Sequence, residues 1–286
     1  MIQSMTGFGK AFLQLSNKKI SVEIKSLNSK GLDLNVRTPS VYREMELQVR
    51  NAIAQRLERG KIDFSLFIEV TGEETATKIN VPIVKGYIHQ MKEVIPNADE
   101  TELMKMAVRM PDALKTEREE LDKTEWLQIE SVIEEALNNI VTFRKDEGRS
   151  LENEFLLRIA NINNLMNQAI SFDKERIETI KTRLRTALDE LQLSVDENRF
   201  EQELIFYLEK YDITEEKVRL GNHLNYFLET INGTEANGRK LSFITQEMGR
   251  EINTMGSKSN HTEMQKLVVM MKDELEKIKE QVLNVL

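Results

Sequence analysis

The feature that most constrains the fold of this chain is the distribution of its prolines. All four prolines lie in the stretch from Pro39 to Pro111, and the rest of the chain, more than half of its 286 residues, contains none. Proline removes a backbone N–H and disrupts the interior of a helix, so a long proline-free region can form long, uninterrupted helices. The sequence therefore predicts a mixed N-terminal part and an almost purely helical C-terminal part.

The N-terminal part alternates apolar and polar residues in the manner of strands that bury one face. This pattern occupies residues 20–25, 32–36 and 62–70, and residues 8–15 form a further candidate strand. Apolar residues at helical spacing run over residues 41–57. We expect a small antiparallel or mixed sheet with a helix packed on it.

The C-terminal part carries apolar stripes at the spacing of long helices. Such stripes run over residues 126–143, 151–172 and 177–191, which predicts an antiparallel hairpin or an extended arm. The last stripe, over residues 264–285, alternates steps of four and three residues, as a heptad seam does. A seam of this kind packs on another helix, either in the same chain or in a neighbouring copy.

Together these patterns predict an α+β fold in three parts. An N-terminal α/β domain with a small sheet and packed helices covers residues 1–125. A long helical hairpin or arm covers residues 126–195. An all-α C-terminal domain, which ends in the heptad-patterned helix and carries the candidate site, covers residues 196–286.

The stretch from Gly238 to Asn260, GRKLSFITQEMGREINTMGSKSN, combines a helical stripe with an unusually varied polar face. The stripe consists of Leu241, Ile244, Met248, Ile252 and Met255. The polar face holds Gln246, Glu247, Arg250, Glu251, Asn253, Thr254 and Lys258. Amides, carboxylates, a guanidinium and a hydroxyl together are typical of a site for a phosphate-bearing ligand and a divalent cation. A solvated helix face with ion pairs four residues apart explains the same pattern.

A second polar face precedes this stretch. Glu216, Arg219 and His223 lie three and four residues apart and therefore share one side of a helix. The carboxylates on the two predicted helices are Glu215, Glu216, Glu247 and Glu251. The cations able to neutralise phosphate oxygens are Arg239, Lys240, Arg250 and Lys258. Hard cations such as Mg²⁺ and Mn²⁺ prefer oxygen ligands, although purely structural ion pairs would give the same residues.

Composition excludes several classes of protein. The chain has no cysteine, which excludes disulfides, a thiol nucleophile and cysteine-based metal sites. Its formal net charge of −8 argues against indiscriminate binding of polyanions. GFGK at residues 7–10 lacks the third glycine of a dinucleotide-binding loop, so no nucleotide cofactor is expected. Because neither a membrane-spanning run nor a signal peptide's apolar core is present, we expect a cytoplasmic protein with no membrane partner.

Several segments of the chain resemble the YicC/YloC family of endoribonucleases. The C-terminal segments that carry the resemblance are DITEEKVRLGNHL, GRKLSFITQEMGREINTMGSKS and KDELEKIKEQVLN. The N-terminal and central ones are SMTGFGK, EIKSLNSKGLDLNVRTP, RLERGKIDFSL and FRKDEGRSLENEF. Residues of about 72 to 125 add little to the match. The chain departs from the family at Val285 and Leu286, where an acidic residue is common, so no role follows for the C-terminal tip.

The resemblance implies a ribonuclease that cleaves RNA internally with a divalent cation, Mn²⁺ or Mg²⁺, as its cofactor. It also implies an N-terminal α/β domain, a helical C-terminal domain and a ring-like homo-oligomer, a hexamer, that encloses RNA. The residues that match its patterned positions are Glu215, Glu216, Arg219, His223, Arg239, Lys240, Gln246, Glu247, Arg250, Glu251, Asn253, Thr254 and Lys258.

On this resemblance, we assign hypothetical roles to the matching residues. The metal ligands are drawn from Glu215, Glu216, Glu247 and Glu251. The catalytic residues are Glu247, Glu251, Arg250 and His223, with His223 as the acid–base candidate. The RNA-binding residues are Arg219, Arg239, Lys240, Asn253 and Lys258. Apart from the resemblance, we expect Arg37, Arg59 and Lys61, near the ends of predicted strands, to extend the basic track.

A rival hypothesis comes from another class of protein. An oligomeric RNA-binding adaptor that presents RNA to a separate nuclease would suit the heptad seam and the helical arm equally well. It would bind RNA without metal and would not cleave it.

Overall fold

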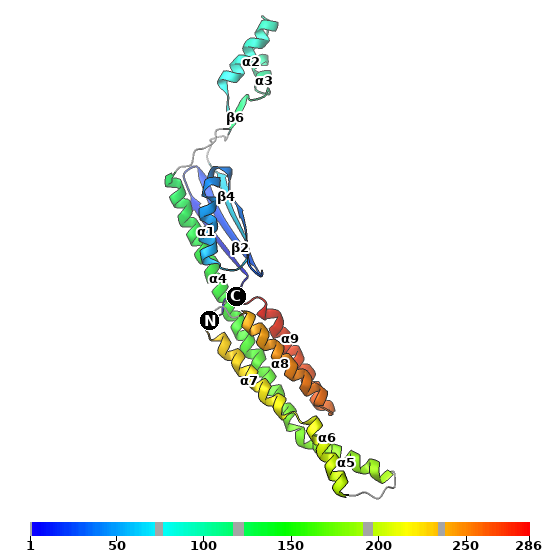
Figure 1. Cartoon of the computed structure of the whole chain (residues 1–286). Helices are drawn as coiled ribbons and strands as arrows, with labels where there is room; N and C mark the ends of the chain where they lie inside the picture. Colours follow the sequence, from blue (N-terminus) through cyan, green and yellow to red (C-terminus); the bar gives the residue numbers. More distant parts are fainter. Residues whose placement is uncertain (1, 72–76, 117–122, 191–196, 234–237) are drawn as a thin grey trace.

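The computed structural model describes residues 2–71, 77–116, 123–190, 197–233 and 238–286. The strands are β1 (Gly7–Gln14), β2 (Lys18–Leu27), β3 (Leu32–Arg37), β4 (Gly60–Val70), β5 (Thr77–Ile79) and β6 (Leu114–Thr116). The helices are the 3₁₀ helix η1 (Ser40–Met45), α1 (Glu46–Arg56), α2 (Val81–Val94), α3 (Glu100–Ala107), α4 (Lys123–Ser171), α5 (Asp173–Glu190), α6 (Glu197–Tyr211), α7 (Thr214–Ile231), α8 (Gly238–Lys258) and α9 (Thr262–Val282). Figure 1 shows an elongated molecule with α2 and α3 at one end and α5 and α6 at the other.

The N-terminal sheet has the strand order β1-β2-β4-β3. Strands β1, β2 and β4 pair antiparallel, whereas β3 pairs with β4 in parallel. The inward-facing residues Ile20, Ile24 and Phe64 are fully buried against α1 and the first half of α4. This arrangement confirms the predicted small mixed sheet with helices packed on it.

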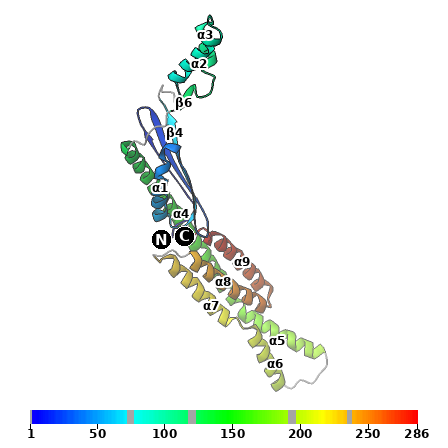
Figure 2. The same ribbon diagram turned by 45° about the horizontal axis from the view of Figure 1, so that its top comes forward.

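Helix α4 is a single helix of 49 residues, about 73 Å long at 1.5 Å per residue. The apolar stripes predicted over residues 126–143 and 151–172 both lie on it. Its first half packs on the sheet, and its second half packs on α7 and α9 (Figures 1 and 2). Because one helix contributes to both cores, it ties the sheet to the helical part. The domain limits at residues 125 and 195 stay predictions.

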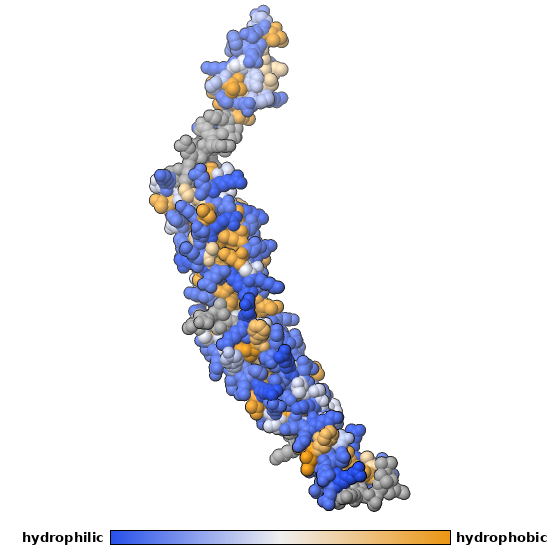
Figure 3. All heavy atoms as spheres, in the orientation of Figure 1, coloured by the Kyte–Doolittle hydropathy of each residue, from blue (hydrophilic) through white to orange (hydrophobic). Residues whose placement is uncertain are grey.

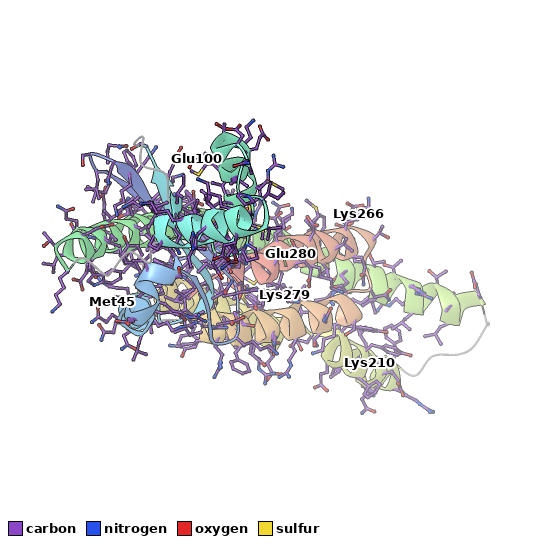
Figure 4. The ribbon with its side chains drawn as sticks, turned by 90° about the horizontal axis from the view of Figure 1, so that it is seen from above. Met45, Glu100, Lys210, Lys266, Lys279 and Glu280 are labelled. Atoms are coloured by element: carbon purple, nitrogen blue, oxygen red, sulfur yellow. The ribbon has the colours of Figure 1, made fainter. Side chains whose placement is uncertain are left out.

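The helical core forms between α4, α7, α8 and α9. The predicted stripe of α8 is buried in it, from Leu241 to Met255. The heptad stripe of α9, from Met264 to Val282, is buried in the same cluster, so the seam finds its partner helices within this chain. Figure 4 shows Lys266 toward one end of α9 and Lys279 and Glu280 toward the other. The α+β fold class is confirmed.

The two ends of the chain meet where the sheet adjoins the helical core (Figure 1). Ser4 forms a β-bridge with Val285, and the Met5 amide donates to the Asn284 carbonyl at 2.7 Å. The Leu286 carbonyl accepts from the amide that opens α8, at 3.2 Å. The C-terminal tip therefore has a structural role, which the resemblance of its sequence to the family did not predict.

Arg144 of α4 holds the same junction together. Its side chain is almost fully buried, and Nη2 donates to the carbonyls of Met5 and Arg59, each at 3.1 Å, and to the Ser26 hydroxyl. Burial away from water lowers the pKa of Arg144. Several segments that carry the family resemblance thus converge on one buried guanidinium, which gives them a structural function.

Candidate functional site

The candidate site lies along the pair of antiparallel helices α7 and α8 (Figure 1). Near the start of α7 and the end of α8, Lys258 Nζ donates to Glu216 Oε1 at 2.7 Å. Two residues that the sequence placed on separate polar faces are therefore in direct contact. The sequence suggested that the polar faces of these two helices could face each other, and they do so at this pair.

Glu216 is the most buried of the predicted site residues. Its residue exposure is only 4%, and among the described residues its second oxygen, Oε2, has no hydrogen-bond partner. A carboxylate oxygen in this position is costly because burial removes water without supplying a replacement. Such an orphaned acceptor is the kind of group that a ligand, a cation or a substrate hydroxyl can satisfy.

Asp212, which sequence reasoning did not include in the site, lies beside this pair. Hydrogen bonds from Thr214, with the nearby charges of Lys258 and Arg176, outweigh burial and hold the pKa of Asp212 below its usual range. Lys258 thus donates to Glu216 and also acts through its charge on Asp212. The only sequence signal for Asp212 was its place just before a helix, where such a residue usually serves as a cap.

Glu251 and His223 lie further along the same helix pair. Each is seven residues from the Glu216–Lys258 contact, so their levels along the two helices agree to within about one turn. Glu251 is 9% exposed and His223 is half-buried. The structure therefore removes Glu251 from the solvated face on which its spacing placed it.

The other predicted carboxylates pair with arginines on their own helices. Glu215 pairs with Arg219 four residues on, and Glu247 accepts from Arg250 Nη1 at 2.7 Å. All four side chains are at least 41% exposed. Exposed pairs of this kind are worth at most about 1 kcal/mol, so a phosphate can displace the carboxylate from the arginine.

The remaining basic and polar residues lie on the surface of α8. Arg239, Lys240 and Asn253 are exposed, and Lys240 Nζ lies 4.7 Å from the ring centre of Tyr226 on α7. Tyr226 and Phe243 are 45% and 61% exposed. Sequence reasoning did not select these two rings, although an aromatic residue outside the apolar stripe was the signal available.

The predicted carboxylates do not gather into one cluster within the chain. Across the described segments, no three histidine, cysteine, aspartate or glutamate side chains lie close enough together to hold a metal ion. Glu216 and Glu251 are the buried members of the predicted set, Glu247 is half-buried and Glu215 is exposed. None of the described helices combines the length and apolar character needed to cross a membrane.

Comparison with known proteins covers nearly the whole chain. The family model for the N-terminal region of YicC-like endoribonucleases matches residues 2–153, and the corresponding C-terminal model matches residues 169–286. A probable endoribonuclease YicC of Clostridioides difficile is 33% identical over 293 residues, which cover 100% of both chains. A probable endoribonuclease YicC of Haemophilus influenzae is 29% identical over 292 residues, which cover 99% of each chain. The chain therefore belongs to the YicC-like endoribonuclease family.

Proposed function

We propose that this protein hydrolyses internal phosphodiester bonds of RNA in the track between α7 and α8, with the help of a divalent cation. The observation that carries the proposal is the Glu216 carboxylate, which is buried beside Lys258 and has one oxygen without a partner among the described residues. The family to which the chain belongs supports the reaction class. The printed names of the two relatives support RNA as the substrate.

The residues fit a cation that keeps much of its water. Mg²⁺ is commonly held by one or two carboxylates together with water and substrate phosphates, rather than by an all-protein cage. Glu216 Oε2 and the Glu251 carboxylate suit this mode, because they are the least exposed carboxylates of the predicted set. The chemistry that such a cation supplies is neutralisation of phosphate charge and activation of a water molecule.

The exposed ion pairs give RNA a way to complete the site. When phosphate oxygens bind Arg219 and Arg250, these guanidinium groups exchange a carboxylate partner for a phosphate. The exchange would release Glu215 and Glu247 and so enlarge the set of carboxylates available for the cation. Lys258 would stay with Glu216 and hold that carboxylate in place.

His223 is the residue proposed to move protons. Its imidazole is half-buried on the side of α7 that carries Glu216, and a neutral imidazole can accept a proton at one ring nitrogen while it donates at the other. Arg239, Lys240 and Asn253, at the surface of α8, would bind RNA beyond the cleaved bond. Along α8 this track is about 30 Å long.

We also propose that the protein acts as a ring-like homo-oligomer, a hexamer. Exposed apolar residues at the α2–α3 end support self-association: Val94, Ile95 and Met106 are 79%, 60% and 58% exposed. Figure 3 shows hydrophobic side chains at both ends of the molecule. Native mass spectrometry would show six copies, whereas a monomer at micromolar concentration would contradict this part of the proposal. The cytoplasmic location stays a prediction.

A cleavage assay tests the proposed function. Purified protein is incubated with an end-labelled structured RNA in EDTA and in Mn²⁺, beside Glu247→Gln prepared in the same way. We expect cleavage only with Mn²⁺ and its loss in the variant. RNA that is bound but never cut, with or without metal, would support the adaptor instead.

A further inference from the structure

The open face of the N-terminal sheet presents aromatic side chains to solvent. Helices α1 and α4 pack on the opposite face only (Figures 1 and 2). On the open face, Phe8 and Phe12 of β1 and Phe67 of β4 are 40%, 64% and 54% exposed. Exposed rings on a regular sheet gain nothing from the core, so they need another explanation.

In the GFGK segment at the start of β1, glycines alternate with larger residues, and this explains how β1 presents these rings. A Cβ added at Gly9 would clash with the backbone oxygen of Ala136, and one at Gly7 would press on α4 as well. The glycines therefore let β1 lie directly against α4. Phe8 and Lys10 occupy the alternate positions and point to the open face. The segment is not a nucleotide loop, but its residue types still suit a ligand-binding surface.

Basic side chains accompany the rings. Lys19 Nζ lies 5.4 Å from the ring centre of Phe12, and Lys25 Nζ lies 5.9 Å from that of Phe8. These distances are within the range of cation–π contacts. Phe12 and Phe8 thus each have an ammonium group over the ring, and this group can bind a phosphate when a base takes its place on the ring.

The surface is also hollowed between the strands. Phe12, Ser21 and Phe67 form one row across β1, β2 and β4, so the small serine separates two rings that stand about two strand spacings, or about 10 Å, apart. Next to this row is a depression of about 300 Å³ lined by Glu23, Lys25, Arg37, Asp63, Ser65 and Phe67.

We propose that this open sheet face, formed by Phe8, Phe12, Phe67, Lys19, Lys25 and Arg37, is a platform for single-stranded RNA. Bases stack on exposed aromatic rings without regard to sequence, and four-stranded sheets with surface aromatics bind unpaired RNA in this way. The inference rests on the proposed function, because it assigns a second contact to the same substrate. The RNA strand that the platform holds would continue toward α7 and α8.

Charge favours RNA over a second copy of the chain. The cations of this face are Lys10, Lys19, Lys25, Arg37 and Lys61, and its carboxylates are Glu23, Asp33, Asp63 and Glu69. Cations thus outnumber carboxylates here, although the chain as a whole has a net charge of −8. The core of a protein–protein interface is depleted in lysine and carboxylates. On this face, by contrast, lysines and carboxylates lie among the aromatic rings.

The test measures RNA affinity apart from cleavage. Binding of a fluorescein-labelled oligouridylate to the full-length protein is followed by anisotropy in EDTA. We expect Phe12→Ala and Phe67→Ala each to weaken binding about tenfold, since stacking of one base contributes a factor of this order. Phe12→Trp should keep wild-type affinity. Phe206→Ala removes an equally exposed ring from α6 and should change nothing.

Crosslinking of the wild-type protein provides a second measurement that needs no variant. A single-stranded RNA containing 4-thiouridine should crosslink to peptides from β1, β2 or β4. Wild-type affinity in both alanine variants, or crosslinks confined to α7 and α8, would overturn the platform and leave the proposed function standing. A smaller oligomer of Phe12→Ala in native mass spectrometry, without loss of RNA affinity, would also overturn the platform. It would indicate that this face is a contact between copies of the chain. Wild-type protein that neither binds nor cuts RNA would instead refute the proposed function itself.

Discussion

Glu216 and Lys258 are 42 positions apart in the sequence, yet their side chains meet at 2.7 Å across α7 and α8. The contact joins the first turn of one helix to the last turn of the other. It neutralises one end of a buried carboxylate and leaves the other oxygen, Oε2, without a partner in the described part of the chain. Stability and proposed chemistry therefore depend on the same pair.

Removal of Lys258 should destabilise the fold. Lys258→Met leaves the Glu216 carboxylate buried without its counter-charge, which costs about 3 kcal/mol. Lys266→Met, which breaks an exposed pair on α9, should change the free energy of unfolding by less than about 0.5 kcal/mol. Urea denaturation of both variants measures the difference, and equal effects would contradict the buried-pair interpretation.

Arg144 should be more important for stability than its neighbour Arg149. Arg144→Met removes the buried guanidinium that donates to the Arg59 carbonyl, and it takes from the Met5 carbonyl one of its two donors, so we expect a loss of about 3 kcal/mol. Arg149 is exposed and, within the described segments, pairs with Asp146 alone, so Arg149→Met should stay within about 0.5 kcal/mol of the wild type. Thermal unfolding compares the two, and a small shift for Arg144→Met would refute its role at the junction.

Glu274 should give stability a specific dependence on pH. Burial opposes its ionisation, but hydrogen bonds from Asn161, Lys277 and Arg158 outweigh burial and lower the pKa of Glu274 to about 2 from 4.5. A carboxyl whose pKa is depressed by folding stabilises the folded state above its unfolded pKa, and this stabilisation is lost as the pH falls toward the folded pKa.

We therefore expect Glu274→Gln to lower the free energy of unfolding by up to about 3 kcal/mol at pH 7. The difference from the wild type should shrink as the pH falls from about 4.5 toward 2. Denaturant titrations at several pH values measure it. A difference that stays constant down to the lowest of these pH values would show that the network around Glu274 is not electrostatic.

Gly9 should not tolerate a side chain. Gly9→Ala places a methyl group against the backbone of α4. Because overpacking strains the fold, we expect the free energy of unfolding to fall by about 1–3 kcal/mol or more. Gly86 lies within α2 with nothing near its missing Cβ, so Gly86→Ala should be neutral or stabilising by up to about 1 kcal/mol. Melting temperatures that fall equally in both variants would contradict the close approach of β1 to α4.

Periodicity predicted the elements of this fold well because their residues bury one face. The alternation over residues 20–25 gave β2, and the steps of four and three gave α9, whose stripe is buried. Periodicity did not show that two stripes belong to the single helix α4. The two halves of this helix pack in different cores, and a stripe does not indicate which surface will cover it. The meeting of the chain ends at Ser4 and Val285 has no local signal at all.

The candidate site was predicted less completely. The polar faces of α7 and α8 and the nearness of Arg250 to Glu247 follow from helical spacing. The burial of Glu216 and Glu251 does not, because it depends on how the two helices pack. Asp212 looked like a cap, and its proximity to Lys258 arises only from the tertiary structure.

The role of the Glu216 carboxylate is tested most sharply by comparing Glu216→Gln with Glu276→Gln, which alters an exposed carboxylate on α9. RNA binding in EDTA and cleavage rate in Mn²⁺ are measured for both variants and for the wild type. We expect Glu216→Gln to bind RNA but to lose cleavage by at least about a hundredfold, a loss on the scale of one catalytic group. Glu276→Gln should cleave RNA at the wild-type rate. A folded Glu216→Gln protein that cleaves RNA at the wild-type rate would contradict the proposed site.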